Sequence, residues 1–150
     1  MRLILNDTTG SIKDNYLQSL VLLYLPCETF SPTENDDKAL HVSVEAHEGV
    51  LTAALQIKVY ERTAALSRTQ QISAESAEPL RLQVKLLVGG AFLEAAQELF
   101  GYLPPWGIVT GIRPAKLAAD YIDQFGAEKT KQILCDKYFV FPERAELCIR

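Results

Sequence analysis

The chain has 150 residues and a mass of 16.7 kDa, with 15 basic and 19 acidic side chains and a net charge of −4. Apolar residues make up 48% and charged residues 23%, as in ordinary globular domains, which excludes disorder over the whole chain. The longest apolar stretch, residues 20–25, is far shorter than the roughly 18 residues of a membrane span. The acidic balance argues against a nucleic-acid or membrane partner.

The start of the chain and its cysteines indicate where in the cell the protein is expected. The apolar run after Met1 turns polar at Asn6, which is too short for a secretory signal, so we expect a cytoplasmic protein. Cys27, Cys135 and Cys148 are widely spaced and form no CxxC motif. This usage is typical of reduced thiols, and we expect all three side chains to be buried or half-buried.

A strand and a helix are the first predicted elements. Residues 2–6 are mostly apolar and lead into a polar turn that ends at Gly10. From residue 11 to residue 24, apolar side chains recur at spacings of three and four, which predicts an amphipathic helix. Pro26 ends this helix, because proline lacks the amide hydrogen that would continue it.

A hairpin is predicted next. Apolar and polar side chains alternate over residues 40–47 and again over 50–60, on either side of Glu48-Gly49. Residues 61–78 leave two interpretations open, an extension of the strand or a loose linker. The first half therefore indicates a small β-α-β-β sheet that needs further elements to cover it.

The second half is predicted to be helical. Pro79 begins a helix that reaches Gly101, a glycine placed where helices commonly end. Gly89-Gly90 inside it indicates either a kink or a close approach of another backbone. Three further helices are predicted, over residues 114–125, 127–138 and from 142 onward.

The fold class that follows is α+β, with a sheet subdomain over residues 1–80 and a helical subdomain over residues 81–150. The last predicted helix begins at Pro142 and stops after about two turns without a terminating residue. We therefore expect the chain to continue in a longer protein, with a frayed terminus as the alternative.

Common catalytic and metal-binding patterns are missing from the sequence. His41 and His47 fall on the polar side of one predicted strand, roughly 20 Å apart at about 3.3 Å per residue, so we interpret them as surface residues. The sequence contains no glycine-rich phosphate loop and no HExxH motif. It therefore predicts no catalytic residue and no metal ligand.

The segment 104–116 is the most informative part of the sequence. Two adjacent prolines restrict its backbone, and Trp106 is the single tryptophan of the chain. Gly107 and Gly111 permit positive φ and close backbone approach, and Thr110 can turn or cap the chain. These residues predict a rigid corner.

The end of this segment suits an anion. Pro114 favours the first turn of a helix, which places Arg113 and Lys116 beside the helix N-terminus. Free amides, the positive end of the helix dipole and two cations together can bind an anion. Three interpretations stay open: a corner that docks the C-terminal helices onto the sheet, with Trp106 as its anchor and Arg113 bonded to backbone carbonyls, a ligand contact, and a contact with a following domain.

Residues 105–116, PWGIVTGIRPAK, resemble the PWGxLTGxRPxK signature of the HemZ-type proteins, which are radical SAM proteins similar to oxygen-independent coproporphyrinogen III oxidase. In that family the signature lies ahead of the radical SAM barrel. Residues 138–147 also resemble the family pattern, so the likeness covers about residues 99–149. Ala115 departs from the signature, where the family has Thr, and Val88-Gly89-Gly90 stands where a Leu-Tyr is expected.

The resemblance implies an N-terminal accessory domain of an enzyme of porphyrin and heme biosynthesis, without catalytic activity of its own. The [4Fe–4S] cluster and S-adenosylmethionine are implied for the parent protein only, because the cluster-binding CxxxCxxC is not in this sequence. The implied partner is the missing C-terminal radical SAM domain.

The implied substrate carries several carboxylates, which Arg113 and Lys116 could contact. The alternative function is a stand-alone protein-interaction module, which predicts exposed apolar surface near Trp106 or the last helix. The sequence leaves the oligomeric state undetermined.

Overall fold

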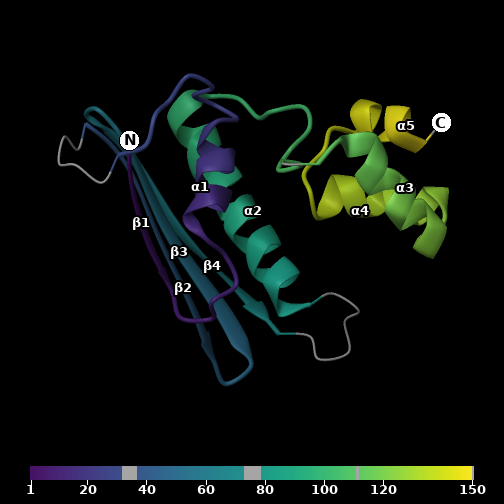
Figure 1. The fold of residues 1–150 in the computed structure, drawn as a ribbon, viewed down its shortest axis with the longest axis horizontal. Helices are drawn as coiled ribbons and strands as arrows, with labels where there is room; N and C mark the ends of the chain where they lie inside the picture. The colour runs from purple at the N-terminus through teal and green to yellow at the C-terminus, as the bar shows by residue number, and fades with distance from the viewer. Residues whose placement is uncertain (32–36, 73–78, 111, 150) are drawn as a thin grey trace. The chain divides into compact units, whose positions relative to one another are not determined.

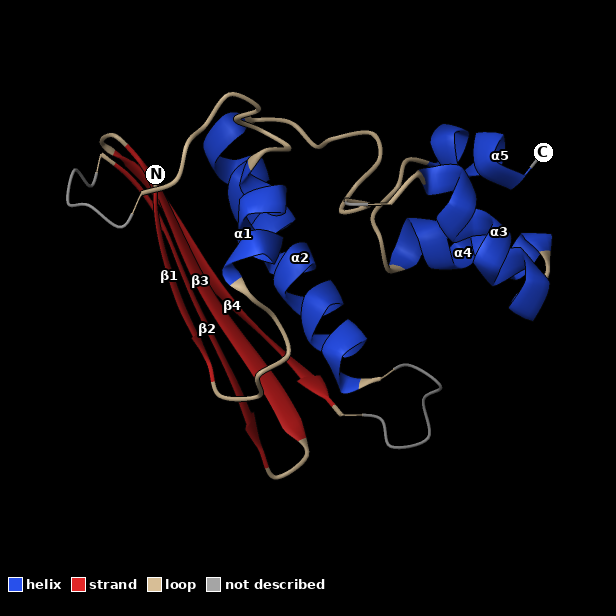
Figure 2. Ribbon diagram, in the orientation of Figure 1, coloured by secondary structure: helices blue, strands red, loops and turns tan. Residues whose placement is uncertain are grey.

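The computed structural model describes residues 1–31, 37–72, 79–110 and 112–149. These residues form two compact units, 1–102 and 103–150, which are considered separately. The first unit contains a four-stranded sheet and two helices, and the second contains three helices (Figures 1 and 2). The predicted α+β class, with a helical region after the sheet, is confirmed.

The sheet has the strand order β1-β2-β3-β4. β1 (Arg2–Asp7) runs parallel to β2 (Lys38–His47), and α1 (Asp14–Val21) lies between them in the chain. β2, β3 (Val50–Val59) and β4 (Arg62–Gln71) form an antiparallel meander. The predicted strands at residues 2–6, 40–47 and 50–60 are therefore present, with small shifts at their ends.

Both hairpins of the meander close through two-residue turns. Glu48 and Gly49 join β2 to β3 with φ angles of 51° and 79°, the left-handed values that a tight turn between twisted strands requires. Tyr60 and Glu61 join β3 to β4, and Tyr60 has φ of 55°. Of the residues 61–78 that the sequence left open, Arg62–Gln71 form a separate strand after this second turn. Residues 73–78 lie outside the described residues.

The helix predicted over residues 11–24 is shorter in the structure. The carboxylate of Asp7 accepts the amide hydrogens of Ser11 (2.8 Å) and Ile12 (3.0 Å), which holds these two residues in a loop ahead of α1. At the other end, the amide of Tyr24 bonds to the carbonyl of Val21, a tighter turn than an α-helix makes.

α2 (Leu80–Phe100) begins directly after Pro79, as predicted. It runs without a break through Gly89 and Gly90, which are both buried, and no interruption of the helix marks them. Gly101 ends the helix with φ of 85°, and its amide bonds to the carbonyl of Gln97, which confirms the predicted terminating glycine.

α1 and α2 lie on one side of the sheet (Figure 1). The strand side chains on this side are buried and alternate with exposed ones. The largest fully buried side chains of the first unit are Leu17, Leu20, Val21, Leu40, Val42, Val44, Leu51, Ile57, Val84, Val88 and Phe92. α2 packs on β3 and β4, so it belongs to the sheet unit. The division of the chain therefore falls at residues 102 and 103, whereas the sequence placed it near residue 80.

An aromatic cluster links the loop after α1 to the end of α2. The Tyr24 ring lies 5.0 Å from the rings of Phe100 and Tyr102 and 6.0 Å from that of Phe92. The Tyr24 hydroxyl donates to the carbonyl of Tyr102 over 2.9 Å. These contacts position the last residues of the first unit.

The second unit contains α3 (Pro114–Phe125), α4 (Ala127–Asp136) and α5 (Pro142–Ile149). The predicted starts at residues 114, 127 and 142 and the predicted end of α3 before Gly126 are confirmed. Its buried side chains include Ile108, Val109, Ala118, Thr130, Ile133, Leu134, Tyr138, Val140 and Ala145. Among the described helices of both units, none combines the length and apolar character that crossing a bilayer requires.

Candidate functional site

The candidate site is the corner at residues 104–110 together with the start of α3, all in the second unit. The corner is a tight turn in which the amide of Gly107 donates to the carbonyl of Pro104 (3.0 Å) and the amide of Val109 donates to that of Trp106 (3.2 Å). Adjacent prolines and this pair of bonds leave the segment little conformational freedom. The predicted rigid corner is therefore present over residues 104–109.

The corner pairs with the loop between α4 and α5. The amide of Ile108 donates to the carbonyl of Tyr138, and the amide of Phe141 donates to the carbonyl of Pro105, each over 2.9 Å. The loop has a sharp bend of its own, because Phe139 has φ of 61°. Two segments some thirty residues apart in the sequence are thus fastened to each other by backbone bonds.

Gly107 is the residue that permits this contact. It has φ of +58°, and a Cβ built on it would lie 1.9 Å from the carbonyl oxygen of Tyr138 and 2.5 Å from the carbonyl carbon of Phe139. No side chain fits at such distances, and backbone atoms cannot move aside cheaply. The glycine of the signature therefore has a structural role.

Trp106 is half-buried and contacts α5. The guanidinium carbon of Arg144 lies 5.8 Å from the centre of its ring, within the range of a cation–π interaction. The loop between α4 and α5 is also held to α3, because the hydroxyl of Tyr138 lies 2.9 Å from the hydroxyl of Tyr121. Trp106 thus anchors the corner to a helix of its own unit, and the predicted docking onto the sheet stays a prediction.

The start of α3 carries the other predicted residues. Pro114 occupies the first helical position, and Arg113 and Lys116 are both exposed. The carbonyl of Arg113 accepts the amides of Lys116 (3.0 Å) and Leu117 (3.2 Å), so these two amides are already satisfied. The two exposed cationic side chains and the helix dipole are still available to an anion.

The predicted residues thus fall into two groups by their contacts. Trp106 and Gly107 contact residues 138–144, whereas Arg113 forms backbone bonds within the first turn of α3. Thr110, which lies between the two groups in the sequence, is half-buried. Gly111 lies outside the described residues. Tyr138, Phe139 and Arg144 complete the corner, and sequence reasoning did not assign them a role there.

The cysteines and histidines do not form a reactive centre. Cys27 is exposed, contrary to the expectation that all three thiols are buried or half-buried, while Cys135 and Cys148 are half-buried. Burial raises the pKa of both the Cys135 and the Cys148 thiol, which lowers the thiolate fraction. His41 and His47 are exposed, which confirms their surface position.

The resemblance implies an iron–sulfur cluster for a parent protein, and the residues of this chain do not fit one. Such a cluster needs thiolates grouped around it, and the sequence has no CxxxCxxC. Within the described ranges, no group of three or more His, Cys, Asp or Glu side chains is arranged to hold a metal ion. We therefore assign no redox step to this chain.

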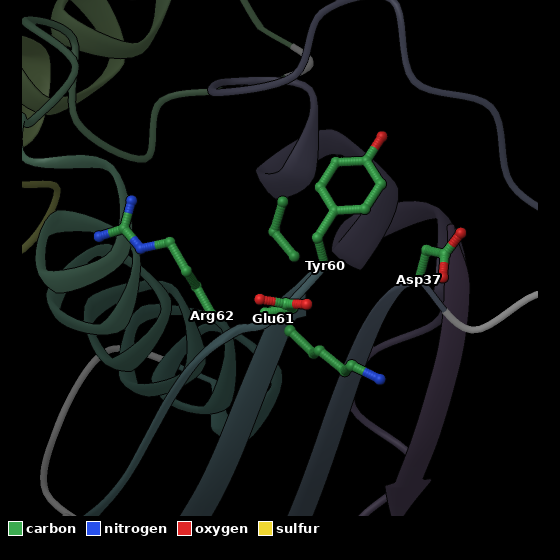
Figure 3. Close-up of a pocket in the computed structure, with 6 residues that line it drawn as sticks. Asp37, Tyr60, Glu61 and Arg62 are labelled. Carbon is green, nitrogen blue, oxygen red and sulfur yellow. The ribbon is translucent and has the colours of Figure 1, made fainter.

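A hollow of about 600 Å³ in the first unit was not foreseen from the sequence (Figure 3). It lies at the turn between β3 and β4 and is lined by Asp37, Lys58, Val59, Tyr60, Glu61 and Arg62. Figure 3 shows the labelled side chains of Tyr60, Asp37 and Arg62 pointing in different directions. A specific ligand site needs polar groups that converge, and this hollow lacks them.

Large apolar side chains are exposed on the second unit at Ile112, Phe125 and Leu147, with exposed fractions of 36%, 47% and 53%. Ile112 follows the corner, and Leu147 lies on α5.

No protein-family model matches this chain, and no curated protein matches it either. The resemblance of residues 105–116 to the HemZ-type signature therefore stays a prediction that depends on the motif.

Proposed function

We propose that this chain is a non-catalytic accessory domain of a radical SAM protein similar to the oxygen-independent coproporphyrinogen III oxidases, acting in the cytoplasm in porphyrin synthesis. The observation that carries the proposal is the signature segment itself. Its Trp and first Gly build one corner with the loop at residues 138–141, and its Arg and Lys stand exposed at the start of α3.

The exposed residues at the end of the signature segment support this proposal. Arg113 and Lys116 stand at the start of α3, which packs on α4 and α5, and a rigid base reduces the entropy lost on binding. Exposed Ile112 stands next to these cations in the sequence and could contact a neighbouring domain. The two cations suit a substrate with carboxylate side chains, which they would contact at the boundary with the barrel.

The first experiment is to determine the reading frame beyond the codon for Arg150. The proposal expects a continuation that contains CxxxCxxC and enough residues for a barrel. A stop codon at that point would remove the proposed parent enzyme, and the chain would then be tested as a stand-alone interaction module.

The second experiment tests the substrate contact in the full-length protein. We expect the double variant Arg113→Ala/Lys116→Ala to bind coproporphyrinogen at least about tenfold more weakly, since two charge-assisted contacts are lost. The matched control is Arg81→Ala/Lys129→Ala, which removes two exposed cations elsewhere and should leave the affinity unchanged. Equal affinities of both double variants would contradict the substrate contact and leave only a docking role.

A further inference from the structure

We propose that β4 pairs with β4 of a second copy of this chain, so that two sheets join into one across a two-fold axis. This inference is independent of the proposed function. β4 is the outer strand of the sheet, and it is ten residues long, whereas β1 at the opposite edge has six. Long exposed edges offer unpaired N–H and C=O groups to another strand.

The backbone of β4 shows which residues face outward. The amide of Ile72 bonds to the carbonyl of Gly49, and Arg62 is the first residue after a two-residue turn. Both facts place the even-numbered residues of β4 in the hydrogen-bonded pairs with β3, because such pairs alternate along an antiparallel ladder. The odd-numbered residues therefore direct their N–H and C=O groups away from β3.

Five residues present these outward groups: Thr63, Ala65, Ser67, Thr69 and Gln71. All five are exposed and uncharged. Within the described residues of the sheet unit (1–31, 37–72 and 79–102), no backbone group bonds to the N–H or C=O of any of them.

The devices that commonly protect an edge strand are scarce in β4. The strand contains no proline and no lysine, and its register with β3 runs without a bulge from Arg62 to Gln71. Its inner charged residue, Arg68, is held on the helix side by Glu94, with hydrogen bonds of 2.6 and 3.1 Å. Arg68 is thereby neutralised within its own chain and need not lose a partner when the edge pairs.

The second copy is the occupant that fits best, because β4 is complementary to itself. Antiparallel pairing centred on Ser67 sets Thr63 opposite Gln71 and Ala65 opposite Thr69, so all five outward residues are used. This arrangement forms about ten backbone hydrogen bonds. It places Arg68 opposite Leu66 and brings no like charges face to face. It also closes on itself, since each copy contributes the same edge.

Sedimentation velocity of the 150-residue chain over a range of concentrations tests the proposal. We expect a dimer that dissociates on dilution. Ser67→Lys should weaken it at least about fivefold, because the two-fold axis sets the two lysines directly opposite each other. The matched control is Ala54→Lys: Ala54 is paired with Ser67 in the sheet, is also exposed and lies on the inner strand β3. This control should dimerise like the unaltered chain.

A charge swap separates edge pairing from unfolding. Ser67→Lys and Ser67→Asp should each be weaker dimers with unchanged circular dichroism, and an equimolar mixture should recover the dimer, since Lys then faces Asp. A monomer of the unaltered chain at all concentrations would overturn the proposal. Equal weakening by Ala54→Lys, or a dimer insensitive to Ser67→Lys, would assign the interface to another surface and overturn it as well.

Discussion

Gly107 lies against the backbone of Tyr138 so closely that a Cβ at residue 107 would come within 1.9 Å of the Tyr138 carbonyl oxygen. The same oxygen accepts the amide of Ile108 over 2.9 Å. The corner and the loop between α4 and α5 are therefore one structural piece, and the glycine is the condition for their contact.

Substituting Gly107 tests this condition. We expect Gly107→Ala to lower the free energy of unfolding by about 3 kcal/mol, since it adds left-handed strain and breaks the bonds to the loop. Urea titration followed by circular dichroism measures the loss. The control is Gly101→Ala, where φ is also positive but a Cβ meets nothing within 4 Å, so only about 1 kcal/mol is expected. Equal losses in the two variants would show that the close contact has no energetic weight.

Asp7 gives the fold a dependence on acid. Burial alone raises the pKa of its carboxyl, but hydrogen bonds from the Thr9 hydroxyl and from the amides of Ile12, Thr9 and Ser11 outweigh it and hold the pKa below the ordinary value of 3.8. A carboxyl whose pKa is lower in the folded chain stabilises that state above the unfolded pKa. The stabilisation is lost as the pH falls through the folded pKa.

Asp7→Asn should therefore cost about 1–2 kcal/mol of unfolding free energy near neutral pH. The difference from the unaltered chain should begin to shrink as the pH falls below about 4 and disappear below the folded pKa, where both chains carry a neutral side chain at residue 7. Chemical denaturation at several pH values measures it. Asp123→Asn, at an exposed site on α3, is the control for the change in net charge. A difference at Asp7 that is constant with pH would contradict the expectation.

Periodicity and turn residues predicted most of the fold, but they left β4 undecided. The stretch 61–78 is mostly small and polar, so no apolar alternation marks a strand, and the turn at Tyr60 uses a residue that rarely adopts positive φ. The helix ahead of residue 14 was overestimated, because a spacing pattern does not reveal that Asp7 captures the amides of Ser11 and Ile12. These are local side-chain-to-backbone bonds, four and five residues apart, which compete with the helix and leave no trace in the apolar spacing.

The candidate site was predicted only in part, because one half of it lies far away in the sequence. The prolines, Trp106 and Gly107 indicated a rigid corner, since their restrictions are local. Its partner loop at residues 138–141 is distant in the sequence, and the tight contact at Gly107 exists only once both segments are folded. Sequence order likewise could not place α2 with the sheet, because that depends on its packing against β3 and β4.

Tyr24 should make the first unit sensitive to alkali. Burial, with a smaller contribution from the charge of Tyr102, raises the pKa of Tyr24 to about 12 from 10.0. A phenol whose pKa is higher in the folded chain stabilises that state below the unfolded pKa, and the stabilisation disappears as the pH rises through the folded value. The relevant window is therefore pH 10 to 12.

We expect Tyr24→Phe to lose about 1 kcal/mol of unfolding free energy at neutral pH, since the hydroxyl no longer reaches the Tyr102 carbonyl. The difference from the unaltered chain should decrease across the alkaline window. Tyr60→Phe makes the same chemical change on a side chain that is 59% exposed, and its neutral-pH stability should match that of the unaltered chain. A neutral effect of Tyr24→Phe, or an equal loss from Tyr60→Phe, would count against the role of the buried hydroxyl.

Arg144 should report on the corner through Trp106, the single tryptophan of the chain. Its guanidinium lies over the indole ring at 5.8 Å. Removing it in Arg144→Ala exposes one face of the ring to water, so we expect the fluorescence emission to shift to longer wavelength. Stability should fall by about 0.5–1 kcal/mol, the usual contribution of an exposed cation–π pair.

Two comparisons separate this contact from general effects of charge. Arg144→Lys keeps a cation and part of the covering side chain, so it should fall between the unaltered chain and Arg144→Ala in both emission and stability. Arg81→Ala removes an exposed arginine from α2 and should leave the emission of Trp106 unchanged. Emission that does not move in Arg144→Ala would mean that the arginine does not cover the ring in solution. The anchor of the corner would then be the two backbone bonds to the loop alone, from Ile108 to Tyr138 and from Phe141 to Pro105.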